Sequence, residues 1–169
     1  MRYAPLLLVI GVLSASLALA AKPAPRPVSG KADQIIVLKH KRQLLLIRGG
    51  RVLKIYPVAL GLHPTGPKLW EGDGKTPEGN YLVDGRVPGS RYHLALHVSY
   101  PGPADQARAQ AAHRSVGGAI MIHGMPNWYS EITMRMAPDW TSGCIAVSND
   151  AIEEIWDAVD DGTPIEIRP

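Results

Sequence analysis

Residues 139–147 read Asp-Trp-Thr-Ser-Gly-Cys-Ile-Ala-Val and include Cys144, the one cysteine in a chain of 169 residues. A glycine directly before a thiol lets a backbone N–H approach a developing oxyanion. The thiol becomes a strong nucleophile when a neighbouring base takes its proton. His123, followed by Gly124 at the end of the apolar run 119–122, is the histidine best placed to be that base. The two segments together predict a site for cysteine-dependent acyl transfer.

The same two segments resemble the L,D-transpeptidase (YkuD) family, whose mark is His-Gly, an insert, and then Ser/Thr-x-Gly-Cys-Ile/Val. Residues 75–81, Lys-Thr-Pro-Glu-Gly-Asn-Tyr, resemble the Thr-Pro-x-Gly-x-Tyr element that leads into a core strand in that family. Two positions depart from the common pattern: Ser142 stands where a histidine is common, and Ala146 where an arginine is common. With these two departures, the segment resembles the YafK-like branch of the family. The resemblance covers roughly residues 32–169.

The resemblance implies a mostly β domain, sandwich-like or barrel-like, with a few short helices, one of them after the cysteine. It implies Cys144 as nucleophile and His123 as proton acceptor and donor, with no cofactor and no metal. The backbone N–H groups of Gly143 and Cys144 are expected to hold the oxyanion. Asp139, Thr141 and a backbone carbonyl all stay open as the group that orients His123. The expected substrate-binding residues are Tyr92, His93, Gly124, Trp140, Thr141 and Ser142.

In the family the substrate is the peptide stem of peptidoglycan, and the reaction passes through a thioester. An amine acceptor then gives a cross-link, whereas water gives hydrolysis. Ala146 removes a guanidinium that could bind a carboxylate, so a hydrolytic enzyme, either a carboxypeptidase or an amidase releasing a wall-attached lipoprotein, is the alternative. An alternative of another class is a non-catalytic envelope protein that binds the wall through its glycine-rich loop. We expect a monomer.

Composition limits the remaining classes. The chain is 46% hydrophobic and 20% charged, which suits one globular domain. Its formal net charge of +3 gives a weak attraction to anionic polymers and no reason to expect nucleic acid. A single cysteine excludes an intramolecular disulfide.

Residues 1–21 have the pattern of a secretory signal peptide. Arg2 supplies the basic start, residues 6–19 are apolar, and Ala-Leu-Ala at 18–20 is a small-x-small cleavage pattern. An uncleaved membrane anchor is the alternative. Residues 22–31 then form a proline-rich linker, and the catalytic domain occupies 32–169. This arrangement predicts export to the periplasm or cell envelope, where structural cysteines usually come in pairs.

Hydrophobic patterning predicts the individual elements. The expected strands are 34–38, 43–47, 52–59, 92–100 and 119–122, with 163–167 as a last edge strand. The expected helices are 105–113 and one starting near 148–150 that buries Ile152, Ile155, Trp156 and Val159. Segment 61–79, rich in glycine and proline, is expected to be a binding loop, and 125–140 a lid or substrate wall. His93 and His97 lie too far apart on one strand to share a metal ion, although both could face the cleft.

Overall fold

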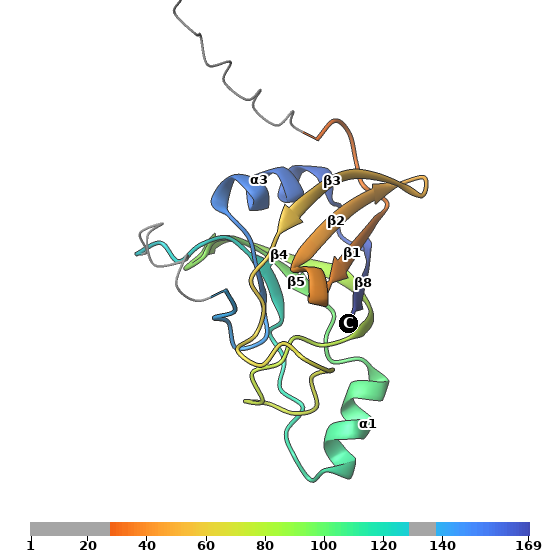
Figure 1. Ribbon diagram of the computed structural model, residues 1–169, viewed down its shortest axis with the longest axis vertical. Helices are drawn as coiled ribbons and strands as arrows, with labels where there is room; N and C mark the ends of the chain where they lie inside the picture. The colour runs from red at the N-terminus through yellow and green to blue at the C-terminus, as the bar shows by residue number, and fades with distance from the viewer. Residues whose placement is uncertain (1–27, 129–137) are drawn as a thin grey trace, which may run out of the picture.

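The structure is a computed structural model that describes residues 28–128 and 138–169 (Figure 1). The expected signal peptide and most of the expected linker lie outside the described residues. So does the middle of the expected lid, 129–137.

The described chain is mostly β with two helices, as predicted. Its strands are β1 (Gln34–Leu38), β2 (Gln43–Arg48), β3 (Arg51–Pro57), β4 (Gly79–Ser90), β5 (His93–Val98), β6 (Met121–His123), β7 (Ile145–Ala146) and β8 (Pro164–Arg168). The helices are α1 (Pro103–Ala111) and α3 (Asn149–Ala158), and a short 3-10 turn, η1 (Lys39–Lys41), joins β1 to β2.

One sheet of eight strands, in the order β3-β2-β1-β8-β4-β5-β6-β7, contains all of these strands. The meander β1–β2–β3 agrees with the prediction from the glycine pair at 49–50. The prediction that the last strand is an edge strand is wrong. β8 lies in the interior of the sheet, parallel to β1 and antiparallel to β4. Its proline is tolerated because Pro164 is the first residue of the strand.

The sheet bends at β4 and almost closes on itself. The first part of β4 pairs with β8 and the second part with β5, and the β4–β5 register shifts twice, between Val83 and Gly85 and between Val87 and Ser90. Such bulges increase the local twist and bend a strand. At the two ends of the sheet, an antiparallel bridge joins Ala59, just beyond β3, to Ala146 of β7. The result is a barrel-like sheet with Cys144 next to its seam.

Helix α3 covers one end of the sheet (Figure 1). The Ser148 hydroxyl caps its first turn by accepting from Ala151 N at 3.2 Å. The buried face contains Ile152 and Ile155, as expected from their spacing. Trp156 is only partly buried and lies under the Arg86 guanidinium, 4.8 Å from its ring centre. None of the described helices is long and apolar enough to cross a membrane.

The loop between Gly61 and Gly79 lacks regular strands and helices but is firmly held. Lys39 is 2% exposed, and its Nζ donates to Gly66 O, Thr76 O and Glu78 Oε1 at 2.6, 2.9 and 2.8 Å. Gly61 N–H donates to Thr76 Oγ1 at 3.0 Å. These bonds satisfy buried polar groups that a loop would otherwise leave unpaired.

The loop closes through direct backbone contact. A methyl group added at Gly61 would collide with the Gly74 carbonyl and would lie 3.1 Å from Gly143 Cα. We therefore expect Gly61→Ala to lower the free energy of unfolding by about 1–3 kcal/mol through overpacking. Urea unfolding measures this change. Gly118→Ala is the matched control, because a methyl group there meets nothing within 4 Å. Equal stability of the two variants would contradict the contact.

Candidate active site

A pocket of about 510 Å³ opens where the β4–β5 hairpin, β6 and the turn before β7 meet. Both residues predicted to be catalytic, His123 and Cys144, line it. Four of the six predicted substrate-binding residues line the pocket as well. The pocket is lined by Val87, Gly89, Ser90, Arg91, Tyr92, Ala95, Ala119, Met121, His123, Trp140, Thr141, Ser142 and Cys144.

The register of β6 and β7 brings His123 and Cys144 together. The two strands are parallel, with Ile122 opposite Ile145 and His123 opposite Ala146. Successive side chains point to opposite faces of a sheet. Ile122 and Ile145 are fully buried in the core. His123 and Cys144, each one position away from these isoleucines, therefore share the opposite face, which borders the pocket.

The His123 ring is oriented by the carbonyl of the next residue. Nδ1 lies 2.7 Å from Gly124 O, and because a carbonyl only accepts, Nδ1 carries the proton. Nε2 is then the nitrogen with a free lone pair. Burial lowers the pKa of His123, and the bond to Gly124 opposes this shift only in part. Of the three groups that the sequence left open, a backbone carbonyl is the one that orients His123.

Aromatic rings enclose the base. The Tyr92 ring centre lies 4.5 Å from that of His123, and the Trp140 ring packs edge-on at 5.7 Å. Trp140 Nε1 is buried without a hydrogen-bond partner among the described residues. Rings on these sides keep the imidazole in place and exclude water from it. They also explain why this histidine is neutral.

Cys144 is held as a thiol. Its Sγ–H donates to Ala119 O at 3.6 Å. Ala119 is a non-glycine residue with a φ of 53°, a left-handed conformation that costs on the order of 1–3 kcal/mol. Burial raises the pKa of Cys144, opposed by the Met121 backbone N–H and by the positive charge of Lys68. With His123 also neutral, the pair in this state is a thiol beside an uncharged imidazole.

Thr141 ties together the turn that carries the nucleophile. Its Oγ1 donates to Cys144 O at 2.8 Å and accepts from Gly143 N–H at 3.0 Å. The second bond occupies a group that the sequence analysis assigned to the oxyanion. That part of the prediction is corrected, because the Thr141 hydroxyl accepts a hydrogen bond from the Gly143 N–H. The assignment of the Cys144 N–H to the oxyanion stays a prediction.

The loop 61–79 supports this turn from behind. Leu62 N–H donates to Thr141 O, and Thr141 N–H donates to Leu60 O. Gly143 has a φ of 134°, and a methyl group on it would lie 2.6 Å from Lys75 O. No residue of 61–79 lines the pocket. In the structure the loop supports the turn of Cys144 through backbone packing, and its role in binding stays a prediction.

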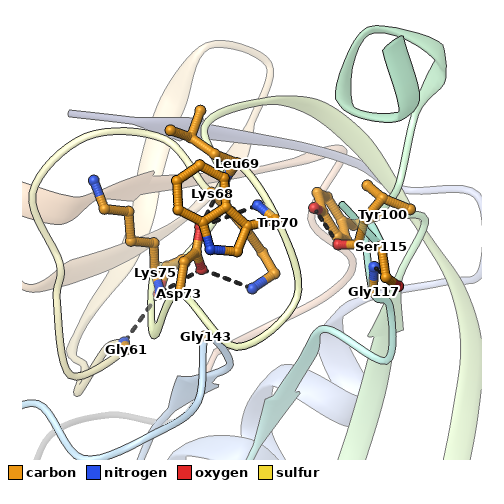
Figure 2. A network of polar contacts seen from close by, with 12 residues as sticks. Gly61, Lys68, Leu69, Trp70, Asp73, Lys75, Tyr100, Ser115, Gly117 and Gly143 are labelled. Carbon is orange, nitrogen blue, oxygen red and sulfur yellow. Dashed lines mark hydrogen bonds and ion pairs between the residues drawn. The ribbon is translucent and has the colours of Figure 1, made fainter. Parts of the chain in front are cut away.

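A buried ion pair fixes the part of the loop that touches Gly143 (Figure 2). The Lys68 and Asp73 side chains are each 4% exposed, and Nζ lies 2.9 Å from Oδ1. Asp73 also accepts from the N–H groups of Leu69, Trp70 and Lys75. Burial alone would raise the pKa of Asp73, but these donors and Lys68 lower it below its ordinary value. Sequence reasoning missed this pair, although an aspartate between Gly72 and Gly74 is typical of a side-chain-closed turn.

Asp139 has a structural role at the start of the motif. Its carboxylate accepts from Arg42 Nε and Nη2, the shorter bond being 2.7 Å, and from Leu60 N–H at 3.0 Å. Arg42 in turn donates to Lys39 O at 2.8 Å. These bonds connect the beginning of the nucleophile segment to η1 and explain why Asp139 is not the partner of His123.

Tyr92, Trp140, Thr141 and Ser142 line the pocket, whereas two other predicted substrate-binding residues do not. His93 has a φ of 69° and points to Glu153, with Nε2 2.6 Å from its carboxylate. Gly124 is packed against Asn149, Ile152 and Tyr92, and acts on His123 through its carbonyl. His97 contacts Asp84 instead of the cleft. Within 28–128 and 138–169, no cluster of His, Cys, Asp or Glu side chains is arranged to hold a metal ion.

Comparison with known proteins identifies one family. The family of the YkuD L,D-transpeptidase catalytic domain matches residues 32–167. A protein of Escherichia coli K12 named as the L,D-transpeptidase YafK is 31% identical over 146 residues, which are 82% of this chain and 52% of that protein. The chain thus spans about half the length of the curated relatives it matches.

Two solved structures have a similar fold. The helical cell shape determining protein Pgp2 of Campylobacter jejuni superposes with a TM-score of 0.62 and 26% identity, over 80% of this chain and 46% of that one. An L,D-transpeptidase of Xylanimonas cellulosilytica superposes with a TM-score of 0.53 over 87% of this chain and 64% of that one. At 22% identity, the second likeness concerns the fold alone.

The Thr141 hydroxyl can be tested by removing or keeping it. Thr141→Val leaves the Gly143 N–H and the Cys144 carbonyl without their partner, so we expect a loss of about 1–3 kcal/mol in the free energy of unfolding and slower labelling of Cys144. Thr141→Ser keeps the hydroxyl and should lose less than half of that amount. Urea unfolding and thiol-labelling rates give the measurement. A valine variant as stable as the wild type would contradict the role of the hydroxyl.

The protonation state of the pair predicts a pH profile. A raised thiol pKa means less thiolate at every pH, so iodoacetamide labelling of Cys144 should be slow near pH 7 and rise about tenfold per pH unit beyond the ordinary thiol pKa of about 8.5. Mass spectrometry follows the adduct, with Cys144→Ala as the unlabelled control. A plateau between pH 6 and 8 would instead indicate a thiolate–imidazolium pair, and the neutral pair described above would be wrong.

Proposed function

This chain belongs to the YkuD family of L,D-transpeptidase catalytic domains, and we propose that it transfers acyl groups from peptidoglycan stem peptides through a thioester on Cys144. One observation carries the proposal. Cys144 and His123 line the same pocket from neighbouring strands, and the Gly124 carbonyl leaves Nε2 of His123 as the unprotonated nitrogen. A thiol and a base in this relation are what nucleophilic acyl transfer requires.

The first half-reaction forms the thioester. As the stem peptide enters, the Cys144 thiol turns from Ala119 O towards Nε2, which takes its proton while Sγ attacks the carbonyl at the L-centre of diaminopimelate. The Cys144 N–H donates to the oxyanion, a contribution on the order of 3 kcal/mol. The imidazolium returns the proton to the leaving amine when the C–N bond breaks. His123 is then neutral again, and the acyl group is bonded to Sγ.

The second half-reaction uses the same base. His123 removes a proton from an incoming amine or from water, which attacks the thioester carbonyl and releases the thiolate to be reprotonated. Cys144 and His123 are both neutral before and after the cycle. The resting protein therefore buries no uncompensated charge at this pair. The rings of Tyr92 and Trp140 are suited to this cycle, because they favour an uncharged imidazole until substrate is in place.

Hydrolysis is the favoured fate of the thioester in this proposal. Ala146 is fully buried and exchanges two backbone hydrogen bonds with Ala59, so this position offers no guanidinium to an acceptor. A weakly bound acceptor amine leaves the thioester to water. The substrate of such an enzyme is either a stem peptide with a free end or a wall-attached lipoprotein.

The place of action is part of the proposal. We expect the leader 1–21 to direct the chain to the periplasm or cell envelope, where peptidoglycan is accessible. Pgp2 determines helical cell shape in its own organism, as its name says. We propose by analogy that this protein remodels the wall. Detection of the mature N-terminus near residue 21 in an envelope fraction tests the export.

The reaction is tested with purified protein and defined substrates. We expect disaccharide-tetrapeptides to be converted mainly to trimmed stems, and wall carrying a lysine-attached protein to release that protein, with both products identified by mass spectrometry. Cys144→Ala should lose turnover by on the order of 10⁴-fold or more while remaining folded.

Three outcomes would change the conclusion. Abundant 3–3 dimers without hydrolysis would return the enzyme to cross-linking. Wild-type turnover in Cys144→Ala would rule out the thioester. Binding to the wall without turnover by the folded wild type would favour a non-catalytic envelope protein.

A further inference from the structure

Charge is distributed unevenly in the catalytic pocket. Among the described residues that line it, Arg91 is the one side chain with a full charge at neutral pH, since burial keeps His123 uncharged. Arg91 belongs to the turn between β4 and β5 and is exposed. Within 28–128 and 138–169, no carboxylate lines the pocket to neutralise it.

The Arg91 guanidinium also differs from most of the described arginines, because it has no partner in the part of the chain that the structure describes. Among the described residues, six other arginines bind a carboxylate, a carbonyl or an aromatic ring, and only Arg51, at the β2–β3 turn, resembles Arg91 in this respect. The six pairs are Arg42 with Asp139, Arg48 with Ser29, Arg86 with Asp161, Arg108 with Asp105, Arg114 with Trp70 and Arg168 with Glu166.

The backbone under Arg91 is fixed by one asparagine on the segment that follows His123 and Gly124. Asn127 N–H donates to Arg91 O at 2.9 Å. Asn127 Nδ2 donates to Ser90 O at 3.1 Å, and its Oδ1 accepts from His93 N–H at 2.9 Å. Three bonds from one residue hold both sides of the turn. A rigid turn lowers the entropy that Arg91 loses when it binds a ligand.

The next residue connects this turn to the catalytic base. Tyr92 packs on the His123 ring with 4.5 Å between ring centres. Arg91 therefore directly precedes the residue that packs on His123, which places its backbone at the rim of the pocket. Ala146, at the position where an arginine is common in the family, is fully buried and offers no charge to the pocket.

We propose that Arg91 is the specificity-determining residue that binds a carboxylate of the acyl-donor peptide next to the bond that is cleaved. The planar guanidinium presents two parallel N–H donors that match a carboxylate, and it stays charged at any relevant pH. The ligand class is a peptide with a free carboxylate within one residue of the scissile carbonyl. The inference rests on the proposed function, since it concerns how the same site selects its donor.

Binding to a protein that cannot turn over separates this inference from the chemistry. Calorimetry on Cys144→Ala measures the affinity for four stem tetrapeptides. One has all carboxylates free, and the others are amidated at the terminal carboxylate, at the glutamate α-carboxylate or at the side-chain carboxylate of diaminopimelate. In the Cys144→Ala background, Arg91→Gln should weaken binding of the free peptide about tenfold. Arg91→Lys should recover part of the loss. Arg51→Gln, which changes the other unpartnered arginine, is the matched control and should bind as before.

The amidated peptides show which carboxylate is bound. The peptide lacking the relevant carboxylate should bind Cys144→Ala about tenfold more weakly, and adding Arg91→Gln should weaken it no further. The loss of affinity caused by Arg91→Gln should also be smaller at high salt, because salt screens the charge of the guanidinium. Equal binding of all four peptides would overturn the proposal. So would an equal loss of affinity on amidation in the presence and absence of Arg91. Tenfold selective binding together with a wild-type protein that never forms an acyl adduct would instead refute the proposed reaction and leave the role of Arg91 standing.

Discussion

The whole site depends on a contact between backbones that leaves no room for side chains. Behind Cys144, the chain at Gly143 meets the chain at Gly61 and the Gly74–Lys75 segment, and a methyl group at either Gly61 or Gly143 would overlap a carbonyl. Because protein interiors are closely packed, such a contact fixes position far more sharply than a flexible side chain does. The Lys68–Asp73 pair and Lys39 hold the loop in this contact. Cys144 is therefore positioned by segments that do not line its pocket.

Local sequence signals were enough for much of the fold and for selecting Cys144 and His123, which the structure brings to one pocket. The meander β1–β3, helix α3 and the pair Cys144–His123 each follow from patterns confined to a few neighbouring residues. The interior position of β8 was not predictable in this way, because it depends on pairing with β1, at the other end of the domain. The same applies to segment 61–79, whose glycines suggested a binding loop. Gly61 serves close backbone packing against Gly74 and Gly143, and periodicity along the chain carries no information about such contacts.

Hydrogen-bond competition explains the errors within the site. The Gly143 N–H looked free for an oxyanion, but the Thr141 hydroxyl reaches it first. His93 was expected at the cleft because it shares strand alternation with Ala95. Its φ of 69° ends that alternation, and Glu153 takes its ring. Residue types and spacing identify which groups can react, whereas the partners of each N–H are settled by the folded chain.

The near-closure of the sheet has a consequence for the order of folding. Ala59 and Ala146 are separated by about half of the chain, yet their bridge joins the two ends of the sheet beside Cys144. Contacts between such distant residues form late, because closing a long loop costs entropy before it gains any contact energy. A chain that is still folding, in transit or partly unfolded, has a cysteine without its base or its pocket. The pocket that Cys144 lines is thus complete only once the two ends of the sheet have met.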